Sequence, residues 1–245
     1  MDRKKKEIED EKIIISTFSG KKNKTLLNFF PEREVKIINL PLIETKAINF
    51  KIPSPIEQYN WIIFTSKNAV EPFYNKVGKT KSKIAAIGKG TAQKLKEYGY
   101  NSNFTGKGIS AVYFLKELNN ILPPNQKILL ALGNLAPDTL QQNLSEKHIV
   151  ERVNIYETKR TKNIDPTIIK RINENKYGVI LVSSPSAVNH LFSLISIKKL
   201  RLVSIGETTT KAIKKYNNKP VATATIPGYK ELIQAALTFL SKDKQ

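Results

Sequence analysis

The sequence predicts an α/β fold built from two similar three-layer domains, each with a parallel sheet, that are joined by a two-stranded β-ladder. Short apolar runs alternate with helical patterns along most of the 245 residues, which is typical of βα units on a parallel sheet. In addition, the segment from Trp61 to Tyr98 resembles a segment that lies 118 residues further along the chain. A solenoid would repeat about every 20–50 residues and several times, so this single long period indicates two homologous domains.

Eight short apolar runs are the predicted strands, and loop signals separate them. The strands are Lys12–Thr17, Val35–Asn39, Trp61–Thr65, Lys83–Ile87, Lys127–Leu132, Gly178–Ser183, Leu200–Ile205 and Val221–Thr225. Asp165-Pro166 predicts a helix start, because an N-cap carboxylate precedes a proline at the first helical position. Ser184-Pro185 and the segment from Asn134 to Asp138 predict similar starts, and the prolines of residues 53–55 and 123–124 mark loops.

The repeat covers two successive strand–turn–helix units without a gap. Phe64-Thr65-Ser66-Lys67-Asn68-Ala69-Val70 corresponds to Val182-Ser183-Ser184-Pro185-Ser186-Ala187-Val188. With the same offset, Ile87-Gly88-Lys89-Gly90-Thr91 corresponds to Ile205-Gly206-Glu207-Thr208-Thr209. The loop lengths are equal in both copies, which favours two domains with one architecture.

The number of strands places the domains on the chain. Only two predicted strands precede Pro41, and the C-terminal copy needs them to match the other copy. We therefore expect a disordered tail at 1–10, a discontinuous α/β domain formed by 11–40 with 159–245, and a second α/β domain at 47–149. Segments 41–46 and 150–158 are extended and free of turn signals, so we expect them to be the linker strands. Both domains are expected to be flavodoxin- or Rossmann-like.

Composition excludes several kinds of chemistry. The chain has no cysteine, which rules out thiolate catalysis, iron–sulfur clusters and thiolate zinc sites. His148 and His190 are the only histidines, so we expect no metal centre. Lysine and arginine number 41 against 21 acidic residues, a net charge of +20 that points to an anionic partner. No apolar run reaches the roughly 20 residues of a membrane span and no signal peptide is evident, which predicts a cytoplasmic protein without membrane contact.

The repeated loops are the candidate binding site. In open parallel sheets, ligands bind beyond the carboxyl ends of the strands, where helix N-termini attract anions. We therefore expect the backbone N–H groups and hydroxyls of both copies to face outward around a common cleft. The candidate substrate-binding residues are Thr65, Ser66, Lys67, Gly88, Lys89, Gly90, Ser183, Ser184, Ser186, Gly206, Thr208 and Thr209, with Thr91 beside them. Helix capping alone is the alternative explanation of each serine and threonine.

Tyr156 is the candidate catalytic residue outside these loops. It lies on a predicted linker strand, where its phenol can donate a proton or a hydrogen bond to a leaving group, although linker packing explains it equally well. His190 is expected to be half-exposed in the helix after Ser184-Pro185, and both histidines are expected to be structural. The motif Gly106-Lys107-Gly108-Ile109-Ser110-Ala111 lacks the acidic residue of a dinucleotide site, so we expect only a helix start that can bind anions.

In order and spacing, these segments resemble the uroporphyrinogen-III synthase family over nearly the whole chain. The matching segments are Trp61–Ser66 with Ala69-Val70, Ile87–Ala92, Asn154–Thr158, Ser183–Val188 and Ile205–Thr209. Each segment is short, and only their combination is specific. The resemblance implies two α/β domains joined by a two-stranded ladder, with the N-terminal strands in the C-terminal domain. The chain departs from the family at Leu132–Asp138, which has none of the basic residues common in related members.

The resemblance also implies the reaction. Members of the family cyclise hydroxymethylbilane, a linear tetrapyrrole with eight carboxylates, with loss of water and inversion of ring D through a spiro intermediate. The product is uroporphyrinogen III. By resemblance, this chain is a monomeric lyase of haem biosynthesis that needs no cofactor and receives its substrate from the upstream bilane synthase. Loss of hydroxide leaves a stabilised azafulvene, so weak acid help from Tyr156 suffices, and Thr91 is the second catalytic candidate.

Two other functions stay open at this point. A nucleic-acid-binding protein would explain the net charge, although no recognisable module interleaves aromatic and basic residues. It predicts an affinity for DNA or RNA that falls steeply with salt. A non-catalytic two-lobed protein that binds a polyanion would explain the duplicated loops, and it predicts tight binding without product.

Overall fold

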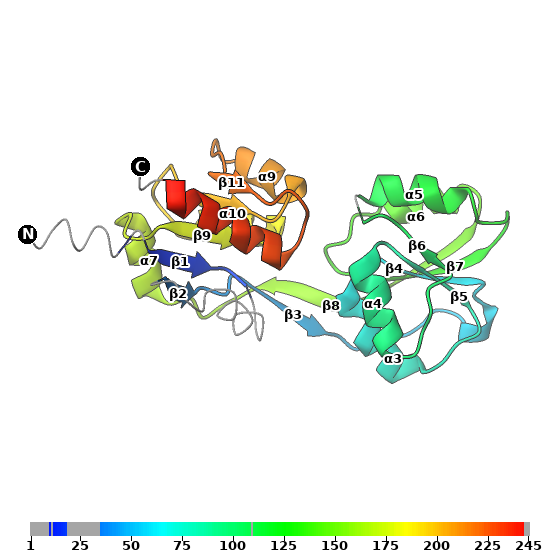
Figure 1. Ribbon diagram of the computed structural model, residues 1–245. Helices are drawn as coiled ribbons and strands as arrows, with labels where there is room; N and C mark the ends of the chain where they lie inside the picture. The colour runs from blue at the N-terminus through cyan, green and yellow to red at the C-terminus, as the bar shows by residue number, and fades with distance from the viewer. Residues whose placement is uncertain (1–9, 11, 19–34, 109, 243–245) are drawn as a thin grey trace, which may run out of the picture. The chain divides into compact units, whose positions relative to one another are not determined.

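The chain divides into two compact units and passes between them twice. The computed structural model describes residues 10, 12–18, 35–108 and 110–242 (Figure 1). Unit 1 comprises Met1–Glu44 and Lys159–Gln245, and unit 2 comprises Thr45–Thr158. Unit 1 is therefore discontinuous in sequence. The predicted disordered tail lies outside the described residues, apart from residue 10.

Unit 2 is built around a six-stranded sheet with the strand order β3-β8-β7-β4-β5-β6. Its strands are β3 (Ile43–Ala47), β4 (Trp61–Phe64), β5 (Lys83–Ala86), β6 (Phe104–Thr105), β7 (Lys127–Gly133) and β8 (Ile149–Arg160). All neighbours from β8 to β6 are parallel. In contrast, β3 runs antiparallel to β8, because Thr45 lies opposite Thr158 and Ile48 lies opposite Ile155.

Helices cover both faces of the unit 2 sheet because its central strand is apolar on both sides. Ile62 and Phe64 of β4 enter the core cluster beneath α3 (Val70–Val77) and α4 (Lys89–Glu97). Trp61 and Ile63 enter the cluster beneath α5 (Ala111–Asn119) and α6 (Thr139–Ser145). The two helix pairs lie on opposite sides of the strands (Figure 1). A strand buried on both faces is expected to be a continuous apolar run, as this one is.

Unit 1 has the same three-layer construction around a five-stranded parallel sheet, with the order β11-β10-β9-β1-β2. Its strands are β1 (Ile13–Ser16), β2 (Lys36–Asn39), β9 (Val179–Val182), β10 (Leu202–Ser204) and β11 (Ala222–Thr223). Its helices are α7 (Pro166–Asn173), α8 (Pro185–Leu194), α9 (Glu207–Lys214) and α10 (Tyr229–Lys242). The first three helices cover one face and α10 covers the other. The prediction of an α/β fold with parallel sheets is confirmed.

The repeat extends further in the structure than the matching residues suggest. When 118 is added to the residue numbers, β4 has the bounds of β9 and β6 has the bounds of β11. With the same shift, α4 begins at the first residue of α9, and α5 begins at the first residue of α10. Gly99 and its counterpart Asn217 both have positive φ, +79° and +52°, after the repeated helix. The remaining strands are permuted: β7 and β8 follow the repeat in unit 2, whereas β1 and β2 precede it in unit 1. Since β7 pairs with β4 as β1 pairs with β9, both units complete the same sheet.

A hydrogen-bonded cluster ties the segment before β4 to the amino-terminal half of the unit 2 sheet. The Glu151 carboxylate accepts hydrogen bonds from the Tyr59 hydroxyl and from Ser54 Oγ, the latter at 2.9 Å. Lys127 Nζ lies 3.8 Å from Glu151 Oε1. Burial by itself raises the pKa of Glu151, but these hydrogen bonds and the lysine charge lower it below its ordinary value. Burial, followed by the bond to Glu151, raises the pKa of Tyr59 to about 12.

This cluster predicts a pH window for stability. The pKa of Glu151 is lower in the folded chain, so its contribution is full above the unfolded pKa of about 4.3 and is lost as pH falls. Tyr59 keeps its proton in the folded chain, so its contribution is lost as pH rises above about 10. We expect Glu151→Gln to lower the free energy of unfolding by about 1–2 kcal/mol at pH 7, and by much less at pH 3, in urea denaturation. Equal losses at both pH values would contradict this, and Glu146→Gln is the exposed control.

Candidate active site

The carboxyl ends of the unit 2 strands bring together residues that are far apart in sequence. Three paired residues are level on β4, β5 and β7, namely Phe64, Ala86 and Ala131. Two residues further along, these strands reach Ser66, Gly88 and Gly133, and Gly133 pairs with Tyr156 of β8. Neighbouring strands are about 4.8 Å apart. Ser66, Gly88 and Tyr156 therefore lie along the side of the sheet at which these strands end, within about 15 Å of one another. We call this side the strand-end edge of unit 2.

This edge contains the switch point of the sheet. From β4 the chain continues to β5 and β6 on one side, and it returns to β7 on the other. Ligands of open α/β sheets bind at the carboxyl ends of the strands where the order reverses in this way. In unit 2 this point lies between the loops that follow β4 and β7. In unit 1 the equivalent point lies between β9 and β1, beside Ser183 and Ser184.

The helix starts differ in how they are capped. Ser66 Oγ accepts a hydrogen bond from the Asn68 N–H, and Ser184 Oγ accepts one from the Ala187 N–H, both at 3.2 Å. These serines therefore act as caps. The neighbouring helices α4 and α9 have no side-chain cap, because glycine occupies their N-cap positions, Gly88 and Gly206. Their first-turn N–H groups are thus better suited to receive the carboxylate of a ligand.

Thr91 and Thr209 are buried, so the expectation that the hydroxyl groups of these loops face outward is wrong for these two residues. They are only 6% and 2% exposed. Thr91 lies one turn before the buried Leu95, on the face of α4 that packs against the sheet. We therefore assign both threonines to packing. The remaining candidates are accessible to different degrees: Lys67, Lys89, Gly90 and Thr208 are exposed, and Thr65, Ser66, Ser183, Ser184 and Ser186 are half-buried.

The two units differ in charge at their strand ends. One exposed lysine follows each of β4, β5 and β6: Lys67 and Lys89 are the first residues of the helical segments after β4 and β5, and Lys107 lies in the loop after β6. The residues 118 positions further on, in unit 1, are Pro185, Glu207 and Thr225. Lys107 Nζ lies 3.3 Å from the Tyr113 hydroxyl and 3.9 Å from Glu117 Oε1. Unit 2 thus presents ammonium groups where unit 1 presents a carboxylate. Comparison of the two copies of the repeat in the sequence could have identified Lys107 as a third lysine of this group.

Tyr156 reaches the end of β7, beside the switch point, because the register of β7 and β8 slips next to it. Leu132 pairs with Asn154, but Gly133 pairs with Tyr156, so Ile155 is the extra residue of a bulge. The outer end of the Tyr156 ring lies over Gly133, since a Cβ atom at residue 133 would be 2.7 Å from the Tyr156 hydroxyl oxygen. The phenol therefore extends from β8 to the end of β7. Among the described residues, no hydrogen-bond partner of this hydroxyl is found, and the side chain is half-buried.

The loop after β7 is held against β8 by side chains that no sequence motif marks. Arg152 donates a hydrogen bond to Asp138 Oδ1 at 2.6 Å and another to the Gly133 carbonyl at 3.3 Å. The Asn134 N–H donates to the Tyr156 carbonyl at 3.1 Å. Arg152 of the neighbouring strand thus fixes the position of this loop. Only the strand pairing reveals Arg152, because it lies on β8, apart from the loop in sequence.

His190 is buried, which corrects the expectation that it is half-exposed. It is 5% exposed, and its Nδ1 donates to the Leu42 carbonyl at 2.6 Å. The same carbonyl, inside the core of unit 1, also accepts the Thr161 N–H at 3.0 Å, so His190 supplies its second hydrogen bond. His148 accepts a hydrogen bond at Nδ1 from the Gln126 N–H at 3.3 Å, and burial followed by the charge of Lys147 lowers its pKa. Both histidines therefore have partners within the fold.

Two further observations concern the described ranges as a whole. Residues 10, 12–18, 35–108 and 110–242 contain no cluster of three acidic or histidine side chains placed to hold a metal ion. Every helix in the same ranges is too short or too polar to cross a lipid bilayer.

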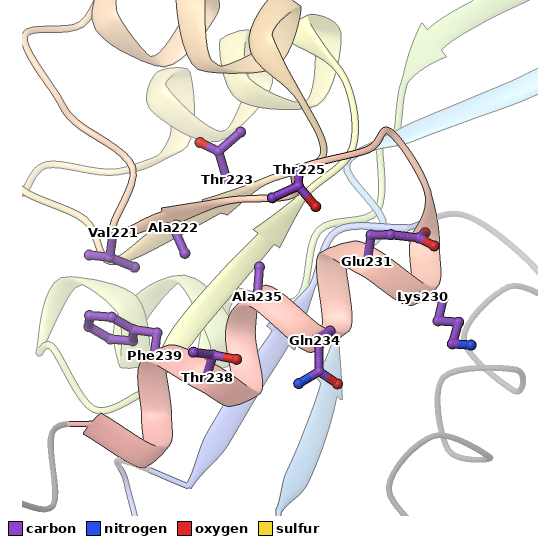
Figure 2. A pocket seen from close by; sticks show the side chains of 10 residues that line it. All are labelled: Val221, Ala222, Thr223, Thr225, Lys230, Glu231, Gln234, Ala235, Thr238 and Phe239. Atoms are coloured by element: carbon purple, nitrogen blue, oxygen red, sulfur yellow. The ribbon is translucent and has the colours of Figure 1, made fainter.

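A cavity of about 480 Å³ lies between β11 and α10 of unit 1 (Figure 2). Ala222 and Ala235 face each other across it, and Phe239 closes one end. The repeat explains this space. In unit 2 the position of Ala222 is occupied by Phe104, whose ring centroid lies 5.7 Å from that of Phe114. The missing ring thus accounts for the part of the cavity beside Ala222.

We expect Ala222→Phe to occupy the part of this cavity beside β11 and to raise the free energy of unfolding by about 1 kcal/mol, with turnover unchanged. The matched change is Phe104→Ala, which removes the equivalent ring from unit 2. It should cost about 2 kcal/mol, less than for a fully buried ring, because Phe104 is half-buried. Urea denaturation measures both changes. A loss of stability in Ala222→Phe would show that β11 and α10 cannot accommodate the ring.

Known proteins resemble this chain in sequence. Residues 28–234 match the family model described as "Uroporphyrinogen-III synthase HemD". The rice protein "Uroporphyrinogen-III synthase, chloroplastic" (Oryza sativa subsp. japonica) is 27% identical over 246 residues, which cover 93% of this chain and 80% of the relative. "Porphyrin biosynthesis protein HemD" of Ruminiclostridium josui is 27% identical over 221 residues, which cover 83% of this chain and 44% of that protein.

Solved structures resemble the chain in fold. A mutant uroporphyrinogen III synthase from the extremely thermophilic bacterium Thermus thermophilus superposes with a TM-score of 0.67 at 15% identity, covering 94% of this chain and 99% of the other. The uroporphyrinogen-III synthetase of Helicobacter pylori gives 0.64 at 18% identity, with 92% and 98% covered. At these identities the likeness concerns the fold alone.

Proposed function

The chain belongs to the uroporphyrinogen-III synthase family of tetrapyrrole biosynthesis, as the resemblance of its segments implied, and from this premise we propose that it cyclises hydroxymethylbilane to uroporphyrinogen III. The proposed reaction loses one water and inverts ring D. The family match does not favour a non-catalytic protein that binds a polyanion or a nucleic acid. The net charge of +20 instead suits the anionic substrate.

The observation that carries this proposal is the composition of the strand-end edge of unit 2. The uncapped first turn of α4, the exposed Lys67 and Lys89, and the phenol of Tyr156 all lie along it. A helix N-terminus attracts an anion by about 0.3–1 kcal/mol, so one such group is weak. Several of them, together with ammonium groups, can hold a chain that carries eight carboxylates.

We propose Tyr156 as the proton donor. Its phenol protonates the terminal hydroxyl group of the bilane, and the C–O bond breaks with release of water. The product of this step is an azafulvene cation, whose positive charge is shared by the pyrrole nitrogen. The substituted α-carbon of ring D then attacks the exocyclic carbon of the azafulvene and forms the spiro intermediate. The bond from this α-carbon to its original methylene bridge breaks, and the methylene carbon bonds to the free α-carbon of ring D, which closes the macrocycle with ring D inverted. The proton released when the last pyrrole regains aromaticity returns to the phenolate. Because the pyrroles stabilise the cation, positioning of the chain matters more than acid strength.

The remaining features of the function are proposed on the same chemistry. No step requires a redox group or a metal, which is why we propose a lyase without a cofactor. The bilane closes spontaneously to the uninverted isomer, which favours its direct transfer from the bilane synthase to this enzyme. We propose that the enzyme acts as a monomer in the cytoplasm.

A coupled assay tests the proposal. Bilane synthase generates hydroxymethylbilane in the presence of the purified chain, and chromatography of the oxidised products separates the type I and type III isomers. We expect predominantly type III. If type I remains the main product at every enzyme concentration, the proposed function is wrong.

A further inference from the structure

We infer that Gly133 is a positioning residue: the missing side chain at the end of β7 leaves the space that the Tyr156 ring occupies, and so aims the phenol at the switch point of the sheet. This inference rests on the proposed function of Tyr156. It concerns unit 2 alone, because β7, β8 and both residues belong to that unit.

The space is specific to the ring. A Cβ atom on Gly133 would lie 2.5 Å from Cε2 and 2.7 Å from the hydroxyl oxygen of Tyr156. Carbon atoms in contact are normally about 3.5–4.0 Å apart. Backbone conformation does not require the glycine: within the described part of the chain, Gly78, Gly99 and Gly108 are the glycines with positive φ. The ring is therefore the physical reason that we assign to glycine at residue 133.

The backbone around Gly133 is held in place, so a methyl group there would have to displace the ring. Arg152 donates to the Gly133 carbonyl at 3.3 Å, and the next residue, Asn134, donates its N–H to the Tyr156 carbonyl at 3.1 Å. The clash, in contrast, involves the outer end of a side chain, which can rotate away. We therefore expect Gly133→Ala to fold normally and to move the Tyr156 hydroxyl.

The size of the displacement sets the expected effect. To restore van der Waals separation, the outer end of the ring must move by about 1 Å. A misplacement of about 1 Å can lower a rate by about 100-fold. This loss requires that Tyr156 acts in the reaction, and it disappears when the ring is absent.

The test compares Gly133→Ala in two backgrounds. In the wild-type background we expect kcat for the type III isomer to fall by about 10- to 100-fold at nearly constant KM. In the Tyr156→Ala background, whose residual turnover is measurable because the azafulvene needs only weak acid help, we expect less than about a twofold further loss. An unchanged kcat in the first background, or an equal loss in both, overturns the inference.

A spectroscopic measurement separates this inference from the proposed function. With 3-fluorotyrosine incorporated at residue 156, we expect the ¹⁹F resonance to shift in Gly133→Ala, while circular dichroism and Tm stay near those of the parent. An unchanged resonance overturns the inference even if the protein is active. If the parent forms no type III isomer, the proposed function fails, and the placement of the ring is still decided by the resonance.

Discussion

Tyr156→Phe should lower kcat for formation of the type III isomer by about 10- to 100-fold, with KM and Tm near their parent values. A general acid contributes about 10²–10⁴ to a rate, and we expect the lower end or less because the azafulvene is stabilised by its own pyrroles. The substitution removes only the hydroxyl, so the ring still occupies the space over Gly133. Since no hydrogen-bond partner of this hydroxyl is found among the described residues, its loss leaves no unpaired buried group.

The measurement is a steady-state assay of isomer formation with substrate generated enzymatically, alongside thermal unfolding. Tyr216→Phe is the matched control, because that tyrosine is exposed in unit 1 and its hydroxyl lies 3.2 Å from Asn189 Oδ1. It should leave kcat unchanged. An unchanged kcat in Tyr156→Phe would remove the role of proton donor and would leave packing as the explanation of this residue.

The sequence predicted the strands well because each is a short apolar run between turn signals. All eight predicted strands occur, but β6 was not among them, since its two residues form no apolar run and owe their pairing to β5. Helix starts were predicted less completely. The helix predicted near Asp138 does begin at Thr139. However, the Asp138 carboxylate binds Arg152 and does not cap the helix. Tertiary contacts thus decide what a capping residue does.

The loops of the candidate site were identifiable from the repeat, but the exposure of their side chains was not. Thr91 is buried because its face of α4 packs against the sheet, and His190 is buried where its ring binds a carbonyl in the core of unit 1. The spacing of residues along the chain reveals neither contact. The slip at Leu132 and Gly133 is a property of two paired strands, so neither strand alone predicts it. For the same reason, the sequence placed Tyr156 only on an extended segment, without a neighbour.

Reversing the charge of both lysines at the strand-end edge, Lys67→Glu with Lys89→Glu, should raise KM for hydroxymethylbilane by about 10- to 100-fold. Both side chains are exposed, so each attraction to a carboxylate is worth about 1 kcal/mol or less. Reversal replaces attraction by repulsion, which makes the change about 1–2 kcal/mol per site before screening, and 1.4 kcal/mol corresponds to a factor of ten. The effect should shrink at about 0.5 M salt because exposed charges are screened.

The control makes the same change of net charge at two exposed lysines elsewhere in unit 2. Lys96 in the last turn of α4 and Lys116 in the last turn of α5 are exposed and far along their helices from the strand-end edge. If Lys96→Glu with Lys116→Glu raises KM as much as the first pair, the overall field of the protein attracts the substrate and the edge is not its binding site. If only the first pair does, the weakened hold should also raise the share of the type I isomer, because a bilane that is not held in place closes without inversion.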